Sequence, residues 1–169
     1  MATKWNLDPT HSEITFKVRH MMISNVKGAF NIFSAEIEAE DDSFKNAKVR
    51  ATINTDSIDT NNADRDAHLK SADFFNAEAN PTITFESTAL ADEITGNLTI
   101  NGVTKPVELE VEFGGINVDP WGNTKAGFSF EGKIKRSDFG LNWNAALETG
   151  GVLVSDDVKI AGELQFVKG

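Results

Sequence analysis

Three histidines could in principle bind a metal ion, but their spacing argues against it. His11 and His20 lie nine residues apart in one extended segment, which separates them by roughly 30 Å. Because zinc needs three or four ligands around a single ion, these two cannot share one, and we expect no metal site. His20 shares the apolar side of its segment. We favour a hydrogen-bonded histidine at the rim of the fold, and contact with a ligand is the alternative.

Arg65 and His68 could bind the phosphate or carbonyl of a ligand's head group. They lie three positions apart in a segment that reads as a short helix, so they share one helical face. Alternatively, Arg65 pairs with a nearby acid and only fixes the loop, and we favour this second interpretation. The acids close in sequence are Asp59, Asp64, Asp66 and Asp73.

Recognisable catalytic motifs are missing from the sequence. The chain has no Gly-x-Ser-x-Gly, no phosphate-binding loop, no His-Glu-x-x-His and no cysteine. A carboxylate pair for glycoside hydrolysis stays open, although nothing in the sequence singles one out. We therefore expect a protein that is not an enzyme and that carries no cofactor.

Composition limits the class of protein and its partners. The 169 residues suit one domain, 1–169, with a sizeable core. The formal net charge of -10 would repel a phosphate backbone, so nucleic acid is not an expected partner. No apolar run approaches the roughly 20 residues of a membrane span. Residues 1–8 contain no apolar leader, which predicts a cytoplasmic protein as the sequence stands, or a periplasmic one if a leader was removed.

Strict alternation of apolar and polar residues organises most of the chain. From Ser12 to His20, the apolar residues Ile14, Phe16 and Val18 face one side and the charged residues face the other, as in a strand with one buried face. The same pattern predicts about eight strands, at 12–20, 28–40, 48–55, 81–90, 94–100, 106–113, 125–135 and 157–167. Tight turns between them predict antiparallel pairing, in either a sandwich or a closed barrel.

Three irregularities interrupt this pattern. The second strand changes parity near Phe33-Ser34, which indicates a β-bulge or bend. Residues 60–71 predict a short helix between the third and fourth strands, anchored by apolar side chains at Leu69, Phe74 and Phe75. Residues 137–155 predict an irregular or helical lid between the seventh and eighth strands. We expect three of its residues either to cover a barrel mouth or touch a ligand, or only to plug the barrel end. These residues are Phe139, Leu141 and Trp143.

Five sequence motifs together resemble the YceI-like family of polyisoprenoid-binding, lipocalin-like proteins. They cover almost the whole chain, in order. The resemblance implies an all-β, eight-stranded antiparallel closed barrel whose apolar interior holds a long isoprenoid, an isoprenoid quinone or a fatty-acid-like lipid. It also allows a homodimer, for which the sequence defines no interface. The motifs are Trp5-x-Leu-Asp8-x-x-His11-Ser12-x-Ile14-x-Phe16-x-Val18-x-His20, Arg65-x-x-His68-Leu69-x-Ser71-x-Asp73-Phe74-Phe75, Pro81-x-Ile83-x-Phe85, Gly96-x-Leu98-Thr99-Ile100-Asn101-Gly102-Val103-Thr104-x-Pro106-Val107 and Arg136-x-Asp138-Phe139-Gly140-Leu141.

The apolar strand faces are the predicted ligand-binding surface. Sequence alone favours a solid core, because most alternating apolar faces are packed, whereas the resemblance favours a cavity that binds, sequesters or transports the lipid. The alternatives are a filled module acting through its acidic exterior and, less favoured, an enzyme acting on a bound lipid. The predicted lining residues on strands are Phe16, Val18, Phe30, Ile32, Ile53, Phe85, Leu98, Ile100, Phe113, Phe128 and Phe130.

Overall fold

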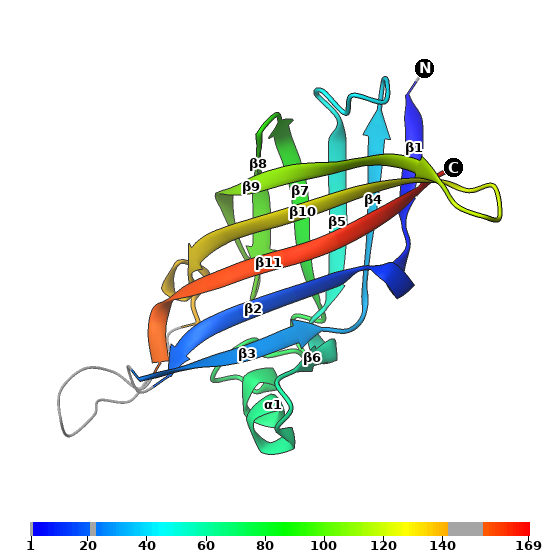
Figure 1. Ribbon diagram of the computed structural model, residues 1–169. Coiled ribbons are helices and arrows are strands. Elements are labelled where there is room, and N and C mark those ends of the chain that lie inside the picture. Colours follow the sequence, from blue (N-terminus) through cyan, green and yellow to red (C-terminus); the bar gives the residue numbers. More distant parts are fainter. Residues whose placement is uncertain (1, 21–22, 142–153) are drawn as a thin grey trace.

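The computed structural model describes residues 2–20, 23–141 and 154–169, which form an antiparallel β-barrel (Figure 1). The ring runs β1-β4-β5-β7-β8-β9-β10-β11 and closes where β11 pairs with β1. β1 and β2 follow each other along β11 and together form one barrel strand. β3 and β4 pair with β2 and β1 and together form the next one, so the barrel has eight strands as predicted. The strands are β1 Thr3–Leu7, β2 Glu13–His20, β3 Ser24–Phe30, β4 Phe33–Ala39, β5 Lys48–Asn54, β6 Ile58–Asp59, β7 Thr82–Leu90, β8 Glu93–Ile100, β9 Val103–Val118, β10 Thr124–Lys135 and β11 Val154–Lys168.

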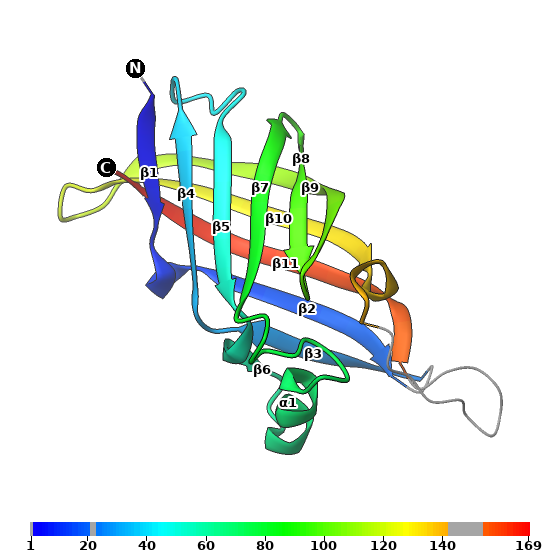
Figure 2. The same ribbon diagram turned by 180° about the vertical axis from the view of Figure 1, so that it is seen from behind.

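The barrel is flattened into two crossing layers. Figures 1 and 2 show β4, β5, β7 and β8 in one layer, crossed by the long strands β9, β10 and β11 together with β2 and β3. The two layers enclose a core of apolar residues. Buried apolar area is the main stabilising term of such a fold, and alternate residues of every strand contribute to it.

The chain switches its inward face between β1 and β2. Trp5 points inward at an odd position, whereas Phe16 points inward at an even one, so one residue must drop out of the alternation. The 3-10 turn η1 (Pro9–His11) makes this change, and Asp8 stabilises it. The Asp8 carboxylate accepts a bond from Lys125 Nζ at 2.9 Å and lies 2.8 Å from His11 Nδ1. Lys125 first, then hydrogen bonds from Thr10 and His11, hold the pKa of Asp8 well below its usual range. The Asp8-x-x-His11 motif is therefore structural.

A second switch of face separates β3 from β4, and it corrects one prediction. The strand ends at Phe30 and resumes at Phe33, so the break lies at Asn31-Ile32 and not at Phe33-Ser34. As a result Ile32 is 61% exposed and Phe33 faces the barrel interior. The change of parity correctly predicted a bend but placed it two residues too late. Ile32 was therefore assigned to the interior in place of Phe33.

One α-helix, α1 (Ala63–Lys70), lies in the predicted 60–71 segment. Asn62 caps it by accepting a bond from the Arg65 amide at 3.0 Å. The helix lies outside the barrel next to β3 and β6 (Figure 2). The other described helices are the 3-10 turns η1, η2 (Thr55–Ser57) and η3 (Arg136–Phe139), and none of the four is long and apolar enough to cross a bilayer.

Aromatic side chains pack together at the end of the barrel near the two termini. Phe44, in the β4–β5 loop, is only 3% exposed and packs against the rings of Trp5 and Phe128 at centroid distances of 5.1 and 5.0 Å. Phe128 also packs against Phe166. Phe113 covers this cluster from outside, stacked on Phe128 at 5.1 Å. We call Trp5, Phe44, Phe113, Phe128 and Phe166 the aromatic stopper.

Candidate ligand-binding cavity

The barrel encloses an apolar cavity of about 240 Å³. One buried water needs roughly 10–15 Å³ on this measure, and voids in packed protein cores rarely exceed that size. The interior is therefore hollow, which argues against the solid core that the sequence alone favoured. The polar exceptions among its described lining residues are Thr15, Ser129 and Arg136.

Most of the predicted lining residues do face this cavity. They come from β2, β3, β5, β7, β8, β10 and the segments around α1 and after η3. Leu69, Phe74 and Phe75 reach the cavity from outside the barrel strands. Lining positions are occupied by Phe16, Val18, Phe30, Ile53, Leu69, Phe74, Phe75, Phe85, Leu98, Ile100, Phe128, Phe130 and Leu141.

Three apolar candidates lie elsewhere, and a fourth cannot be placed. Ile32 points to solvent because of the β3–β4 break. Phe113 is 44% exposed, packs against Phe44 and Phe128 of the aromatic stopper, and does not line the cavity. Phe139 is buried in η3, away from the cavity wall, and its carbonyl accepts a bond from Asn101 Nδ2 at 3.3 Å. Trp143 and most of the predicted lid lie outside the described residues.

The polar candidates also lie away from the cavity wall. Arg65 donates from Nε to Thr60 Oγ1 at 2.8 Å and from Nη2 to Thr60 O at 2.6 Å. It therefore fixes the loop, as favoured, but through a threonine and not through an acid. His68 lies within α1, and its Nε2 is 3.0 Å from Oδ2 of Asp73, which follows the helix. His20, at the end of β2, is half-buried and does not line the cavity.

Arg136 is the charged residue that sequence reasoning missed. It lines the cavity, is 6% exposed, and is the one ionisable side chain among the described lining residues. Its guanidinium donates to the carbonyls of Leu141 at 2.5 Å, Ser155 at 2.9 Å and Val154 at 3.1 Å. Burial lowers its pKa. These bonds join the end of η3 to the start of β11, so Arg136 shapes the barrel end opposite the stopper. The Arg136-x-Asp138-Phe139-Gly140-Leu141 motif was the available signal.

Apolar lining residues were also missed, chiefly on strands whose alternation was read but not assigned to the cavity. β4 and β5 contribute small, branched and aromatic side chains, and β11 contributes five apolar residues. These residues are Ile14, Phe33, Ala35, Ile37, Val49, Ala51, Ile83, Leu90, Ile94, Val107, Leu109, Val111, Ile134, Val154, Val158, Ile160, Leu164 and Phe166.

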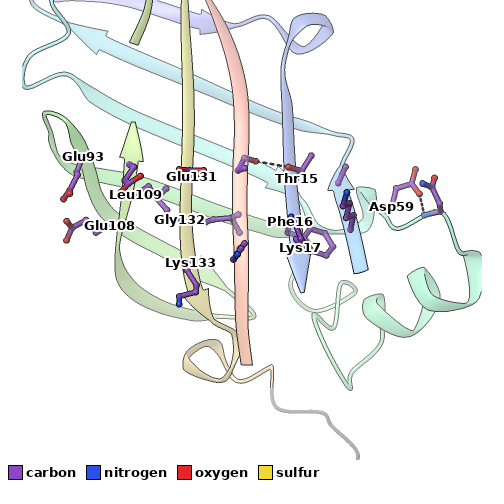
Figure 3. A pocket seen from close by; sticks show the side chains of 18 residues that line it. Thr15, Phe16, Lys17, Asp59, Glu93, Glu108, Leu109, Glu131, Gly132 and Lys133 are labelled. Atoms are coloured by element: carbon purple, nitrogen blue, oxygen red, sulfur yellow. Dashed lines mark hydrogen bonds between the residues drawn. The ribbon is translucent and has the colours of Figure 1, made fainter. Parts of the chain in front are cut away.

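The outer face of the same strands carries a second hollow, an open groove of about 860 Å³ (Figure 3). Four lysines on the neighbouring strands β10, β11, β2 and β3 form a row along the groove, in which each lysine is the direct cross-strand partner of the next. Their order is Lys133, Lys159, Lys17, Lys27. A row of three glutamates lies next to them, in the order Glu93, Glu110, Glu131. We call these the lysine row and the glutamate row. The groove lies on the outer face and is lined largely by charged residues, whereas the cavity lies inside the barrel and is lined almost entirely by apolar ones.

An eight-stranded antiparallel barrel around an apolar cavity defines a lipocalin-like fold. The family model for the YceI-like domain matches residues 5–166, and the chain belongs to this family. It is 42% identical to a UPF0312 protein of Staphylococcus epidermidis over 97% of each chain. It is 36% identical to the crystal structure of a Campylobacter jejuni YceI protein, with a TM-score of 0.76 over 89% of this chain and 90% of that one.

A further solved structure shares the fold at low sequence identity. It is described as a polyisoprenoid binding domain from Saccharophagus degradans, and it matches with a TM-score of 0.71 and 16% identity over 98% of each chain. At this identity the likeness concerns the fold.

Proposed function

We propose that this protein binds a long apolar ligand, an isoprenoid or a related lipid, inside the barrel, and that it sequesters or carries that ligand. The observation that carries the proposal is the apolar cavity of about 240 Å³ inside the barrel. The description of the Saccharophagus degradans domain as polyisoprenoid binding supports the choice of ligand class.

Burial of hydrocarbon provides enough free energy for such binding. Each CH₂ group removed from water contributes about 0.8 kcal/mol, so a prenyl or acyl chain binds without a polar anchor. Ordering a flexible chain offsets part of this gain. The wall matches the requirement, because the described lining residues are nearly all aliphatic or aromatic.

The direct test is extraction of freshly purified protein with organic solvent, followed by mass spectrometry. We expect a co-purifying lipid with a long hydrocarbon chain. A protein that carries none, and that also fails to bind quinones, polyprenyl phosphates and fatty amides, contradicts the proposal.

A matched pair of tryptophan variants separates a hollow barrel from a filled one. Leu98 is buried and lines the cavity, whereas the neighbouring Asn97 is exposed. In a hollow barrel, Leu98→Trp fills space and blocks binding with little loss of stability, and in a solid core it overpacks and costs about 1 to 3 kcal/mol. Asn97→Trp, the control, should leave both ligand binding and unfolding unchanged.

A further inference from the structure

Four glycines stand at inward positions of the barrel, and each is covered by a large side chain from the neighbouring strand. Phe16 lies over Gly28, Phe85 over Gly96, Leu109 over Gly132 and Phe130 over Gly162. Two of these pairs, Phe16 with Gly28 and Phe130 with Gly162, are directly opposite in the strand register. All four covering side chains line the cavity.

The covering side chains occupy the space that a Cβ atom would take. A Cβ built on Gly28 would lie 2.7 Å from Phe16 Cε1 and 2.9 Å from Thr60 Cγ2. A Cβ on Gly162 would lie 2.7 Å from Phe130 Cζ, and one on Gly96 would lie 2.6 Å from Phe85 Cζ. Non-bonded carbon atoms prefer roughly 3.5–4.0 Å, so no larger residue fits beneath these rings as they stand.

Backbone conformation does not explain these glycines. The described glycines with positive φ are Gly102, Gly115, Gly122 and Gly140, all outside this set. Gly28, Gly96, Gly132 and Gly162 lie within regular strands, where a glycine weakens the strand and usually marks a close approach of another group. Space, and not a required turn, is what demands glycine at these four positions.

We propose that these four glycines set the free volume of the cavity, and therefore the length and girth of the chain that it accepts. Each glycine lets a bulky side chain lie flat against the barrel wall, and a methyl group there would push that side chain toward the cavity centre. The empty volume, about 240 Å³, lies below the roughly 300–1,000 Å³ of typical ligand pockets, so one displaced ring removes a substantial part of it. The ligand aspect rests on the proposed function, and the volume aspect does not.

Gly28→Ala is the test variant, because the side-chain atoms of Phe16 and Thr60 are the nearest to the new Cβ. Gly127→Ala is its matched control, since a methyl group on Gly127, in β10, would meet no atom within 4 Å and this residue does not line the cavity. Xenon reports the empty apolar volume directly. The chain-length series is geraniol, farnesol and geranylgeraniol, measured by displacement of a fluorescent apolar probe.

Gly28→Ala should take up less xenon than the wild type and bind geranylgeraniol at least tenfold more weakly, with geraniol changed less than threefold. Each CH₂ kept out of the cavity weakens binding roughly fourfold, so two displaced groups exceed tenfold. The control should match the wild type in both measurements. The double variant Gly28→Ala/Phe16→Leu should recover xenon uptake, because the smaller side chain no longer needs the glycine.

A folded Gly28→Ala variant with unchanged xenon uptake overturns the proposal. A double variant whose xenon uptake stays as low as that of Gly28→Ala also overturns it. If Gly28→Ala fails to fold, Phe16→Ala tests the same point in the opposite direction: xenon uptake should rise, and no rise overturns the proposal. If the wild type takes up xenon but binds none of the three prenols, the proposed function fails while the xenon comparison still decides the role of the glycines.

Discussion

The two faces of strands β10, β11 and β2 carry opposite kinds of side chain at neighbouring positions. Phe16, Ile160 and Phe130 face the cavity. One residue away on two of these strands, Lys17 and Lys159 belong to the lysine row on the outer groove. Lys133 forms a long ion pair with Asp157 at 3.8 Å, whereas Lys17, Lys27 and Lys159 form none with the described residues.

The difference teaches which face determines the register of the sheet. Like charges directly opposite each other on neighbouring strands destabilise pairing, by up to about 1 kcal/mol per pair. Burial of one Phe or Ile side chain contributes about 1.5–3 kcal/mol. The inner face therefore outweighs the lysine row, and a slip of one residue would turn the lysines into the cavity. The outer face tolerates an unfavourable charge pattern because it does not decide the fold.

The largest expected effect comes from placing the same new residue on each face. Phe16→Glu should lower the free energy of unfolding by about 3 kcal/mol at pH 7, because it removes a partly buried ring that packs against the core and puts a carboxylate in an apolar site. Lys17→Glu, one residue along, should change it by less than about 1 kcal/mol and in the stabilising direction. Urea denaturation measures both.

A pH series sharpens this comparison. Burial raises the pKa of a carboxyl in an apolar site, so the loss in Phe16→Glu should shrink as pH falls. Equal losses for the two variants would mean that the two faces are not distinct.

An intermediate effect is expected at Asp8, which holds the switch of inward face between β1 and β2. Asp8→Asn should lower the free energy of unfolding at pH 7 by about 2 kcal/mol, because a mostly buried charged hydrogen-bond acceptor is lost. Folding lowers the Asp8 pKa, so its contribution is present above the unfolded value of about 4 and is lost as pH falls toward the folded value.

The variant should therefore show a flatter decline of stability below about pH 4 than the wild type. Asp157→Asn is the control, since its ion pair with Lys133 is more than half exposed on both sides and should matter little. If the free energy of unfolding of Asp8→Asn depends on pH in the same way as that of the wild type, the charge of Asp8 does not stabilise the fold.

The smallest expected effect lies within the lysine row. Lys159→Glu replaces repulsion of Lys133 and Lys17 by attraction and should raise the free energy of unfolding by about 0.5 kcal/mol. The gain should fall in 1 M NaCl, where the screening length is about 3 Å. Lys159→Gln should give a smaller gain. A loss of stability on Lys159→Glu would show that the row has a local role beyond repulsion.

Alternation predicted the barrel well because it depends on neighbours within one strand. It failed where distant segments decide the outcome. β1 was missed because Trp5 and Leu7 are too few to show a period, although Trp5 is 1% exposed. Phe113 follows the inward alternation but is 44% exposed and packs against Phe44, a loop residue that no strand pattern could place.

The candidate site was predictable as a surface but less so in its details. Phe16, Phe85 and Phe130 were assigned from the pattern of their own strands. The reason that they leave a hollow is the glycine opposite or diagonal to each, and that relation depends on the pairing register between strands. Arg136 was missed for a similar reason, because the carbonyl groups of Ser155 and Val154 that it binds come from β11.

The aromatic stopper has a consequence for how a ligand could enter and leave the cavity. Phe44 packs against Trp5 and Phe128 at this end of the barrel, so a ligand could pass there only if these rings moved apart. If the cavity holds the proposed long-chain lipid, the end of the ligand that lies against Phe128 and Phe166 of the stopper meets aromatic rings that the other end does not.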